Sequence, residues 1–452
     1  MAGADGPRGA DLTVFAADWV LPVEGEPIAE GAVAIEDGRI AAVGSSRELG
    51  PADERFGDAA IVPGFVNAHS HLEYAVYAGF GDGLPFVPWI LDHVRRKERV
   101  AWDETLEIAR LGGAECLSSG ITTVGDASHR GATARACDEL GLRAIVYIEV
   151  FGGTPEEALA RFEASRERAG NSFSARVGLG ISPHTPFNIS TEIYAACAEL
   201  GLPLATHFSE SQAEVDWLVS GSGPLARFAE AGFNLVPPTG TSGIRRLADA
   251  GLLGPRMTAA HCVQVDAGDI ALLADHDVAV AHCPRSNAFL GCGIAPLMEL
   301  REAGIRVGLG TDSPNSAMSF DMFEEMRAAV LSARARTRRA DALTASEALE
   351  LATLGSSRAL GLGSEIGSLV PGKRADLAVV SLRGSAYLPW EDPAAAVVYG
   401  GSPERVLLTV VDGVVRFRKG ETEWPEELCR KAASARRRML GGAPVPPLAR
   451  AR

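Results

Sequence analysis

The stretch that decides the fold is Ile61–His71, which reads IVPGFVNAHSH. It is a short apolar run that ends in polar residues, and such a run predicts a buried strand. Seven similar runs follow, with helix-like stretches such as Asp103–Ser119 and Thr154–Ala169 between several of them. The eight runs are Ile61–His71, Ile121–Ser128, Arg143–Val150, Arg176–Pro183, Leu202–Ser209, Met257–Gln264, Asp277–Pro284 and Arg306–Ser313.

Eight strands that alternate with helices predict one α/β architecture. Right-handed βαβ units build a parallel sheet, and eight of them close into a (β/α)8 barrel, the TIM barrel. The alternative is an open doubly wound sheet. That fold usually has fewer strands and a glycine-rich phosphate loop after the first strand, which this sequence lacks.

The regions on either side of the barrel, residues 61–365, are predicted to form a second, smaller domain together. Residues 1–60 and 366–420 contain short alternating strands with turns such as Asp37-Gly38 and Asp412-Gly413. Neither region has enough strands to be stable alone, so we expect a composite β-sandwich built from both chain ends. Residues 421–452 are expected to be a basic helical tail, either a solvated surface element or, less favoured, a partner-binding segment.

Composition excludes several classes of protein. The chain has 452 residues, 46% of them hydrophobic and 22% charged, which are ordinary values for a globular enzyme. The net charge of −15 argues against nucleic-acid binding. No apolar run approaches the roughly 18 to 20 residues of a membrane span, and no signal peptide is recognisable. Seven cysteines without a C-x-x-C pair favour a reducing compartment, so we expect a cytoplasmic protein.

Polar side chains with metal-binding capacity stand at the ends of the predicted strands. They are His69, His71, His184, His207, His261, His282 and Asp312. Catalytic side chains of a parallel barrel gather at this end, and His69 and His71, two residues apart, face the same side. Any one of them alone is more often a hydrogen-bonded core residue. Burying seven such side chains without hydrogen-bond or metal partners would cost several kcal/mol. The set of seven therefore predicts a metal ion with its bound water. His93, His129 and His276 are expected in loops or helices instead.

Glu210 lies three residues beyond His207, just past the fifth strand. A carboxylate beside a metal and its water is suited to moving protons. The alternative is a surface glutamate in a loop. Its fixed offset from a candidate ligand favours the catalytic interpretation.

Taken together, the motifs resemble those of the metal-dependent amidohydrolase superfamily. The resemblance spans roughly residues 10–420 and has its motifs in the expected order. The motifs are PGFVNAHSH (63–71), GITTV (120–124), HFSE (207–210), AHC (260–262), HCPRSN (282–287), GIAP (293–296), GTDS (310–313) and GSLVPGKRADL (367–377).

This resemblance implies a metal site with defined roles. It places one divalent ion, zinc or alternatively iron, on His69, His71, His207 and Asp312. A single ion is implied because the fourth strand, Arg176–Pro183, lacks the lysine that bridges two metals in binuclear members. His261 would contact the metal-bound water or the substrate. Glu210 would act as general acid and base, and Asp312 would also accept a proton from the water.

Within the superfamily, the chain is similar to the branch of adenosine-type deaminases and chlorohydrolases. SPHTPF (182–187) resembles the segment that carries a substrate-binding histidine, which implies this role for His184. Trp89 followed by Glu98 resembles a helix whose glutamate holds ribose hydroxyls. The runs Asn67–Glu73 and Cys283–Asn287 are most similar to the aminodeoxyfutalosine deaminases of menaquinone biosynthesis.

The substrate of that group is an adenine nucleoside that carries a benzoate. Arg285 would then pair with the carboxylate, or alternatively brace the loop after strand seven. Glu73 is likewise either a substrate contact or a structural hydrogen-bond partner.

The expected activity is therefore hydrolytic removal of the 6-amino group of an adenine nucleoside, with 6-amino-6-deoxyfutalosine as the leading candidate. The expected partner is this small molecule, with neither nucleic acid nor membrane, in a homodimer of the kind common among such barrels. Alternatives are deamination of S-adenosylhomocysteine, methylthioadenosine, guanine or a pterin, or a triazine-type chlorohydrolase. A scaffold without metal is disfavoured because all four ligand positions are filled.

Overall fold

The computed structural model describes residues 12–230, 232–384, 391–422 and 426–441. Its larger part is a parallel barrel whose eight strands pair in chain order, as predicted. They are β6 (Phe65–Ser70), β7 (Ile121–Ser128), β8 (Arg143–Val150), β9 (Val177–Pro183), β10 (Leu204–Phe208), β11 (Met257–His261), β12 (Ala279–His282) and β13 (Val307–Leu309). A parallel bridge between Ser70 and Asp312 brings the last strand back to the first, so the open-sheet alternative is wrong.

Helices surround this barrel, and the two helix-like stretches of the sequence correspond to α3 and α5. The helices are η1 (Leu72–Tyr77), α2 (Phe86–Lys97), α3 (Trp102–Ser118), α4 (Ala132–Leu140), α5 (Pro155–Ala169), η2 (Gly170–Ser172), α6 (Thr191–Glu199), α7 (Gln212–Ser220), α8 (Ala226–Glu230), α9 (Gly243–Asp249), α10 (Ala267–Asp275), α11 (Pro284–Phe289), α12 (Leu297–Glu302), α13 (Pro314–Ala317), α14 (Met322–Thr337), α15 (Ala345–Glu350), η3 (Leu351–Gly355) and α16 (Ser356–Ala359).

The bounds of α5 illustrate how local chemistry sets these helices. The Thr154 hydroxyl accepts a hydrogen bond from the Glu157 amide, and Pro155 occupies the first turn, where its missing N–H costs nothing. The helix ends at Gly170, whose φ of 65° suits glycine.

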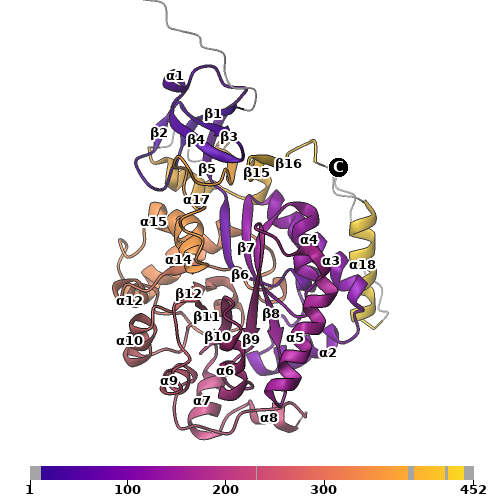
Figure 1. The fold of residues 1–452 in the computed structure, drawn as a ribbon. Coiled ribbons are helices and arrows are strands. Elements are labelled where there is room, and N and C mark those ends of the chain that lie inside the picture. Colours follow the sequence, from indigo (N-terminus) through magenta and orange to yellow (C-terminus); the bar gives the residue numbers. More distant parts are fainter. Residues whose placement is uncertain (1–11, 231, 385–390, 423–425, 442–452) are drawn as a thin grey trace, which may run out of the picture.

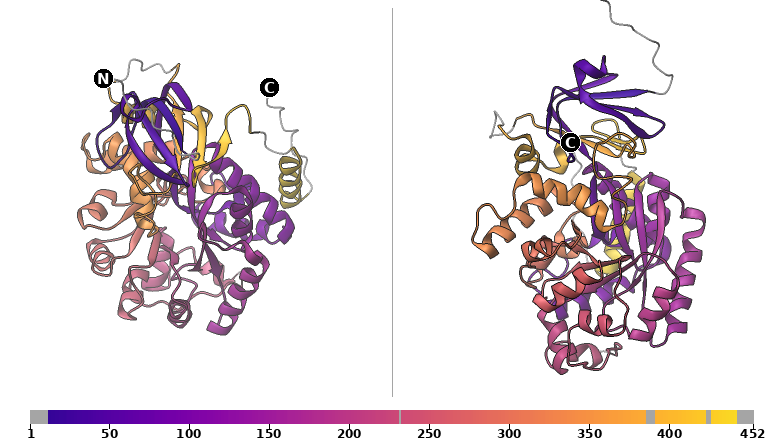
Figure 2. Two further views of the ribbon diagram at one scale, coloured as in Figure 1. Left: turned by 45° about the horizontal axis from the view of Figure 1, so that its top comes forward. Right: turned by 60° about the vertical axis from the view of Figure 1, so that its left-hand side comes forward.

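A second sheet contains strands from both ends of the chain, which confirms the composite β domain (Figures 1 and 2). Its strands are β1 (Thr13–Val20), β2 (Ile28–Ala29), β3 (Gly31–Glu36), β4 (Arg39–Ser45), β5 (Glu54–Pro63), β14 (Leu377–Ser381), β15 (Val406–Val411) and β16 (Val414–Arg418), with α1 (Ser46–Leu49) after β4. The two ends meet where β5 pairs antiparallel with β14, with Pro63 opposite Leu377. The hairpin of β3 and β4 folds back on residues 372–375, because Ile40 exchanges backbone hydrogen bonds with Lys373 and Gly372.

The composite domain is attached at the N-terminal ends of the barrel strands. Arg143, the first residue of β8, forms a buried ion pair with Asp376 (2.8 Å) and a second one with Asp412 (2.5 Å). Only Gly64 separates β5 from β6, and a Cβ there would lie 2.2 Å from the Thr122 side chain. The opposite, C-terminal mouth of the barrel is therefore left for the functional site.

Two helices differ from the expectations. We predicted strands and turns over residues 366–420, yet α17 (Pro393–Gly400) and η4 (Pro403–Arg405) lie between β14 and β15, and α17 packs on α14 and α15. We expected a solvated tail, yet α18 (Glu426–Met439) packs on α3 and buries Ala432, Ala435 and Met439 completely or nearly so. The remainder of the predicted tail, residues 442–452, lies outside the described residues.

Within the described ranges, no helix combines the length and the apolar character needed to cross a bilayer.

Candidate active site

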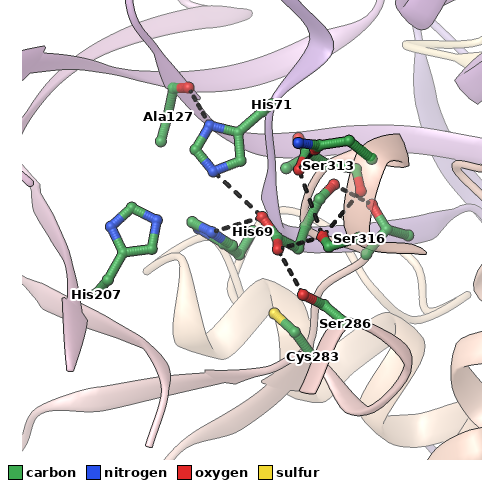
Figure 3. A network of polar contacts seen from close by, with 12 residues as sticks. His69, His71, Ala127, His207, Cys283, Ser286, Ser313 and Ser316 are labelled. Atoms are coloured by element: carbon green, nitrogen blue, oxygen red, sulfur yellow. Dashed lines mark hydrogen bonds and ion pairs between the residues drawn. The ribbon is translucent and has the colours of Figure 1, made fainter. Parts of the chain in front are cut away.

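Four side chains from three parts of the barrel wall converge at its C-terminal mouth. His69 is the penultimate residue of β6 and His71 follows that strand, His207 belongs to β10, and Asp312 follows β13. Asp312 Oδ1 lies 3.3 Å from His71 Nε2 and 3.7 Å from His69 Nε2. The rings of His69 and His207 have centroids 4.9 Å apart. The structure thus brings together the four residues that the sequence predicted as metal ligands, and Figure 3 labels the three histidines among them.

Hydrogen bonds fix which atom of each group faces the cluster. His71 Nδ1 donates to the Ala127 carbonyl and His207 Nδ1 to the His184 carbonyl, both at 2.8 Å, which leaves each Nε2 free. Asp312 Oδ2 accepts hydrogen bonds from Ser286 (2.6 Å) and Ser316 (2.7 Å), so Oδ1 is the free oxygen (Figure 3).

This arrangement fits a divalent metal ion. His69 Nε2 is buried without a hydrogen-bond partner among the described residues. Burying a polar atom in this way costs free energy unless a ligand such as a metal ion binds to it. Three imidazoles and one carboxylate form a donor set that suits zinc or iron. Burial lowers the pKa of His69 to about 4, which keeps this ring in the neutral, metal-binding form. Burial also acts to lower the pKa of His71, but Asp312 outweighs it and raises that pKa to about 9, so metal binding there would release a proton.

Glu210 and His261 lie beside the cluster. His261 Nε2 is 3.8 Å from Glu210 Oε1, and His261 Nδ1 contacts Asn287 Oδ1 at 2.9 Å. Burial raises the pKa of Glu210 well above its usual 4.5, and the nearby Asp312 charge raises it further. Glu214, which the sequence analysis did not identify, holds the turn at Glu210, since its carboxylate accepts hydrogen bonds from the Ser209 and Glu210 amides.

A cavity of about 250 Å³ opens onto these groups. His71, His207, Glu210, His261 and Asp312 contribute to its wall. Of the predicted substrate contacts, His184 and Glu98 also line it, His184 after β9 and Glu98 at the exposed C-terminal end of α2. His282 does not line the cavity. It is buried at the end of β12, and neither ring nitrogen has a hydrogen-bond partner among the described residues.

Arg285 and Glu73 do not line this cavity, and the structure gives both of them bracing contacts. All three guanidinium nitrogens of Arg285 are engaged by Glu324, Glu325 and Ser319. The buried Glu73 carboxylate accepts hydrogen bonds from the Ser128 hydroxyl and from the Arg130 and Ala132 amides. The structural alternatives therefore describe these two residues, and pairing of Arg285 with a substrate carboxylate finds no support here.

Further polar residues line the cavity without having been identified from the sequence. Besides Glu214, those with a titratable nitrogen or carboxylate group are His93, Lys97, His129, Glu149 and Arg161. His93 and His129 were expected in helices or loops, and His93 indeed lies on α2 and His129 directly after β7, from where both reach the cavity wall. Glu149 stands near the end of β8, and a lone charge in the otherwise apolar stretch AIVYIEV was a signal for it.

Comparison with known proteins adds independent information. Residues 60–416 match the profile of the Amidohydrolase family, and residues 31–52 match an imidazolonepropionase-like composite domain of bacteria. The chain is 36% identical over 417 residues to a 5-methylthioadenosine/S-adenosylhomocysteine deaminase of Symbiobacterium thermophilum, with 88% of this chain and 92% of the relative covered. It is 33% identical over 412 residues to a 5'-deoxyadenosine deaminase of Methanothermobacter thermautotrophicus, with the same shares covered.

Among solved structures, the chain is similar to a zinc-bound adenosine deaminase of Xanthomonas campestris. The TM-score is 0.85 at 27% identity, and the match covers 95% of this chain and 98% of the other. The similarity therefore extends over the barrel and the composite domain together.

Proposed function

The chain belongs to the amidohydrolase family, and from this premise we propose that it is a metal-dependent hydrolytic deaminase of adenine nucleosides. The observation that carries the proposal is the cluster of His69, His71, His207 and Asp312 beside a buried Glu210 on one wall of a nucleoside-sized cavity. The deaminase relatives, at 33% and 36% identity, support the same reaction class.

We propose that His69, His71, His207 and Asp312 hold one zinc ion, with iron as the alternative. When bound, such an ion supplies hydroxide near neutral pH by lowering the pKa of its water. Glu210, whose raised pKa favours the protonated carboxyl, would donate to the ring nitrogen beside C6. Asp312 Oδ1 accepts the proton of the attacking water, and His261 Nε2 orients the attacking oxygen. Asp312 then gives its proton to the amine and Glu210 takes the hydroxyl proton, so that the C6–N bond breaks, ammonia leaves and a hypoxanthine nucleoside remains.

Cations on the cavity wall favour one class of 5'-substituent. Lys97 is half-buried over the Phe151 ring (5.2 Å), and Arg161 is exposed at the wall. Among the described residues neither has a carboxylate within ion-pair distance, although Glu149, Glu98 and Glu73 interact electrostatically with Lys97. We therefore propose that the substrate carries a carboxylate on its 5'-substituent. S-adenosylhomocysteine and 6-amino-6-deoxyfutalosine, the latter linked to menaquinone biosynthesis, both meet this condition, and the first also fits the relatives.

A substrate panel tests this proposal. Ammonia release would be measured with adenosine, 5'-deoxyadenosine, methylthioadenosine, S-adenosylhomocysteine and 6-amino-6-deoxyfutalosine, with guanine, a pterin and a triazine as alternatives. We expect the two carboxylated nucleosides to have the highest kcat/KM, and Lys97→Met and Arg161→Ala to raise KM for them while sparing 5'-deoxyadenosine. Equal kcat/KM for carboxylated and neutral nucleosides would contradict the anionic substituent. Turnover of guanine, the pterin or the triazine alone would contradict nucleoside deamination.

Metal analysis of the purified protein addresses the scaffold alternative. We expect about one equivalent of zinc or iron per chain, reduced strongly in His69→Ala. Less than a tenth of an equivalent after metal-replete expression would instead favour a protein that has kept the barrel without the catalyst.

A further inference from the structure

The terminal helix α18 contacts the chain segment that forms one wall of the cavity. Helix α2 contributes Trp89, His93 and Lys97 to that wall. Hydrogen bonds connect α18 with the chain just before and just after α2, between residues 340 to 360 positions apart in the sequence. Figure 1 shows α18 beside α3, on the outside of the barrel. Neither metal binding nor proton transfer involves this helix.

Arg436 of α18 holds the chain where η1 ends. Its guanidinium group donates hydrogen bonds to the carbonyl oxygens of Val76 and Ala78, the latter at 3.0 Å. The same group lies over the ring of Phe80, 4.3 Å from the ring centroid, which is the geometry of a cation–π contact. Two backbone acceptors and one aromatic face therefore fix Arg436 against residues 76–80.

Helix α2 is attached to the same aromatic ring. The Arg96 guanidinium lies 4.4 Å from the Phe80 centroid, and Asp92, one turn earlier on α2, accepts a hydrogen bond from Arg96 Nε at 2.6 Å. Just beyond α2, Arg99 Nη1 donates to the Met439 carbonyl at the end of α18 (3.1 Å). The terminal helix thus contacts the segment on both sides of α2.

The loop that leads into α2 places few constraints on the helix by itself. Residues 82–85 are exposed, and Gly79 and Gly83 have φ angles of 79° and 75°, which glycine adopts without strain. Segments with little burial open at a low cost in free energy. Contacts made outside this loop therefore decide where α2 lies.

A row of rings connects Phe80 with the cavity. The centroids of Phe80 and Tyr77 are 5.8 Å apart, and those of Tyr77 and His93 are 5.3 Å apart. His93 lines the cavity, whereas Phe80, Tyr77 and Arg436 do not. Phe80 therefore lies one layer behind the wall, where its position affects the wall without contact to a bound molecule.

From these contacts we propose that Arg436 is a positioning residue for substrate binding, which holds Phe80 and, through Phe80, the cavity wall on α2. The inference rests on the proposed function and deepens it. A protein whose binding-competent arrangement is only partly populated binds its ligand more weakly by that fraction. Loss of the Arg436 contacts therefore raises KM. It leaves kcat unchanged, because bound substrate restores the arrangement at saturation.

The first test compares Arg436→Met with Arg437→Met, an exposed arginine on the same helix, in metal-loaded enzyme. KM and kcat are measured for 5'-deoxyadenosine and for S-adenosylhomocysteine. We expect Arg436→Met to raise KM for both nucleosides by about 3- to 30-fold, the range that one cation–π contact corresponds to, with unchanged kcat and metal content. Arg437→Met should match the wild type. The rise for both nucleosides distinguishes this effect from that of Lys97→Met, which should affect the carboxylated nucleoside alone.

A second set of variants tests whether Arg436 acts through Phe80. Arg436→Lys keeps a cation for the ring and should restore part of the affinity. Phe80→Leu keeps apolar bulk without the ring and should raise KM as Arg436→Met does. Because the two residues share one contact, the double variant should have nearly the KM of either single variant.

Amide hydrogen exchange provides a readout that does not depend on turnover. In Arg436→Met, the amides of residues 79–97 should exchange at least about 3-fold faster than in the wild type, because this segment opens more often. The barrel strands β8 and β9 should keep their protection, and Arg437→Met should show no change in either region.

Several outcomes would overturn the inference. These are an unchanged KM in Arg436→Met, an equal rise in Arg437→Met, and additive effects of Phe80→Leu and Arg436→Met. A fall in kcat at unchanged KM, or faster exchange throughout the barrel strands, would also overturn it and would assign Arg436 to the chemical step or to global stability alone. Failure of the proposed function is distinguishable, since the wild type would then release no ammonia from either nucleoside. The exchange comparison would still decide whether α18 holds α2.

Discussion

At the scale of single residues, Glu210 illustrates how burial assigns a chemical role. Burial raises its pKa and so favours the protonated carboxyl, and Glu210 lies beside the four proposed metal ligands without belonging to them. We expect Glu210→Gln to lower kcat/KM by about 10²- to 10⁴-fold, the usual contribution of a general acid or base, with unchanged metal content. Steady-state kinetics and metal analysis of the same preparation measure both effects. Near-normal turnover in this variant would remove Glu210 from the mechanism.

Glu115 on α3 provides a residue-scale prediction about stability. Burial raises its pKa from the usual 4.5 to about 7, so the folded chain binds a proton more tightly there than the unfolded chain does. Stability contributed by this site is therefore lost as the pH rises from about 4.5 to about 7, by up to about 3 kcal/mol. We expect Glu115→Gln to be more stable than the wild type at pH 8, with a smaller difference at pH 5.

Thermal or denaturant unfolding at the two pH values measures this difference. Glu167→Gln, an exposed substitution on α5, is the matched control and should show no such change between the two pH values. A Glu115→Gln variant whose stability relative to the wild type is independent of pH would contradict the prediction.

At the scale of elements, α18 makes its own testable contribution. Ala435 is completely buried where the helix packs on α3, and Arg436 reaches over the Phe80 ring to the carbonyls of Val76 and Ala78. We expect Ala435→Asp to lower the free energy of unfolding by about 2 to 4 kcal/mol, because it buries an unpaired charge. Ala433→Asp, at a partly exposed position of the same helix, should cost less than about 1 kcal/mol. Equal effects of the two substitutions in denaturant unfolding would mean that α18 does not pack as described.

The same helix shows what sequence reasoning missed at this scale. Apolar runs closed by histidines predicted the barrel strands because strand period and strand ends are local properties of the chain. The burial of Ala432 and Ala435 depends on contacts with α3, which lies about 300 residues away in sequence. The local excess of basic residues could therefore indicate only a solvated helix. In the same way, the apolar sequence of α17 is equally compatible with a strand. Only its packing on α14 and α15 determines that this segment is a helix.

The residues of the candidate site likewise fall into two groups, those that local sequence motifs identify and those that only the folded structure identifies. The four proposed ligands and Glu210 have short, fixed motifs, so the sequence alone brought them together. Glu149 also lines the cavity, and the sequence did not identify it, because which side chains form a cavity wall depends on the folded structure. Arg285 is the reverse case, since its charge suggested either a ligand contact or a loop brace, and the structure shows bracing partners for it.

At the scale of the whole molecule, the buried ion pairs of Arg143 connect the two domains. We expect Arg143→Ala to lower the free energy of unfolding by about 3 to 5 kcal/mol, because Asp376 and Asp412 would lose their buried partner. KM and kcat per folded molecule should not change, since these contacts lie at the barrel end opposite the mouth. Arg39→Ala, which removes an exposed pair with Glu365, is the control and should cost about 1 kcal/mol or less. A fall in kcat with unchanged stability would contradict this division of roles.

The pairing of β5 with β14 also has a consequence for synthesis. During translation the first five strands of the composite domain leave the ribosome long before β14, β15 and β16 exist, so β5 must wait beside a growing barrel without its neighbour β14. Unpaired strand edges are prone to association with other chains during such a delay. Nascent chains of this protein are thus most vulnerable to aggregation near their N-terminus, and chaperone binding there should persist until the C-terminal strands emerge.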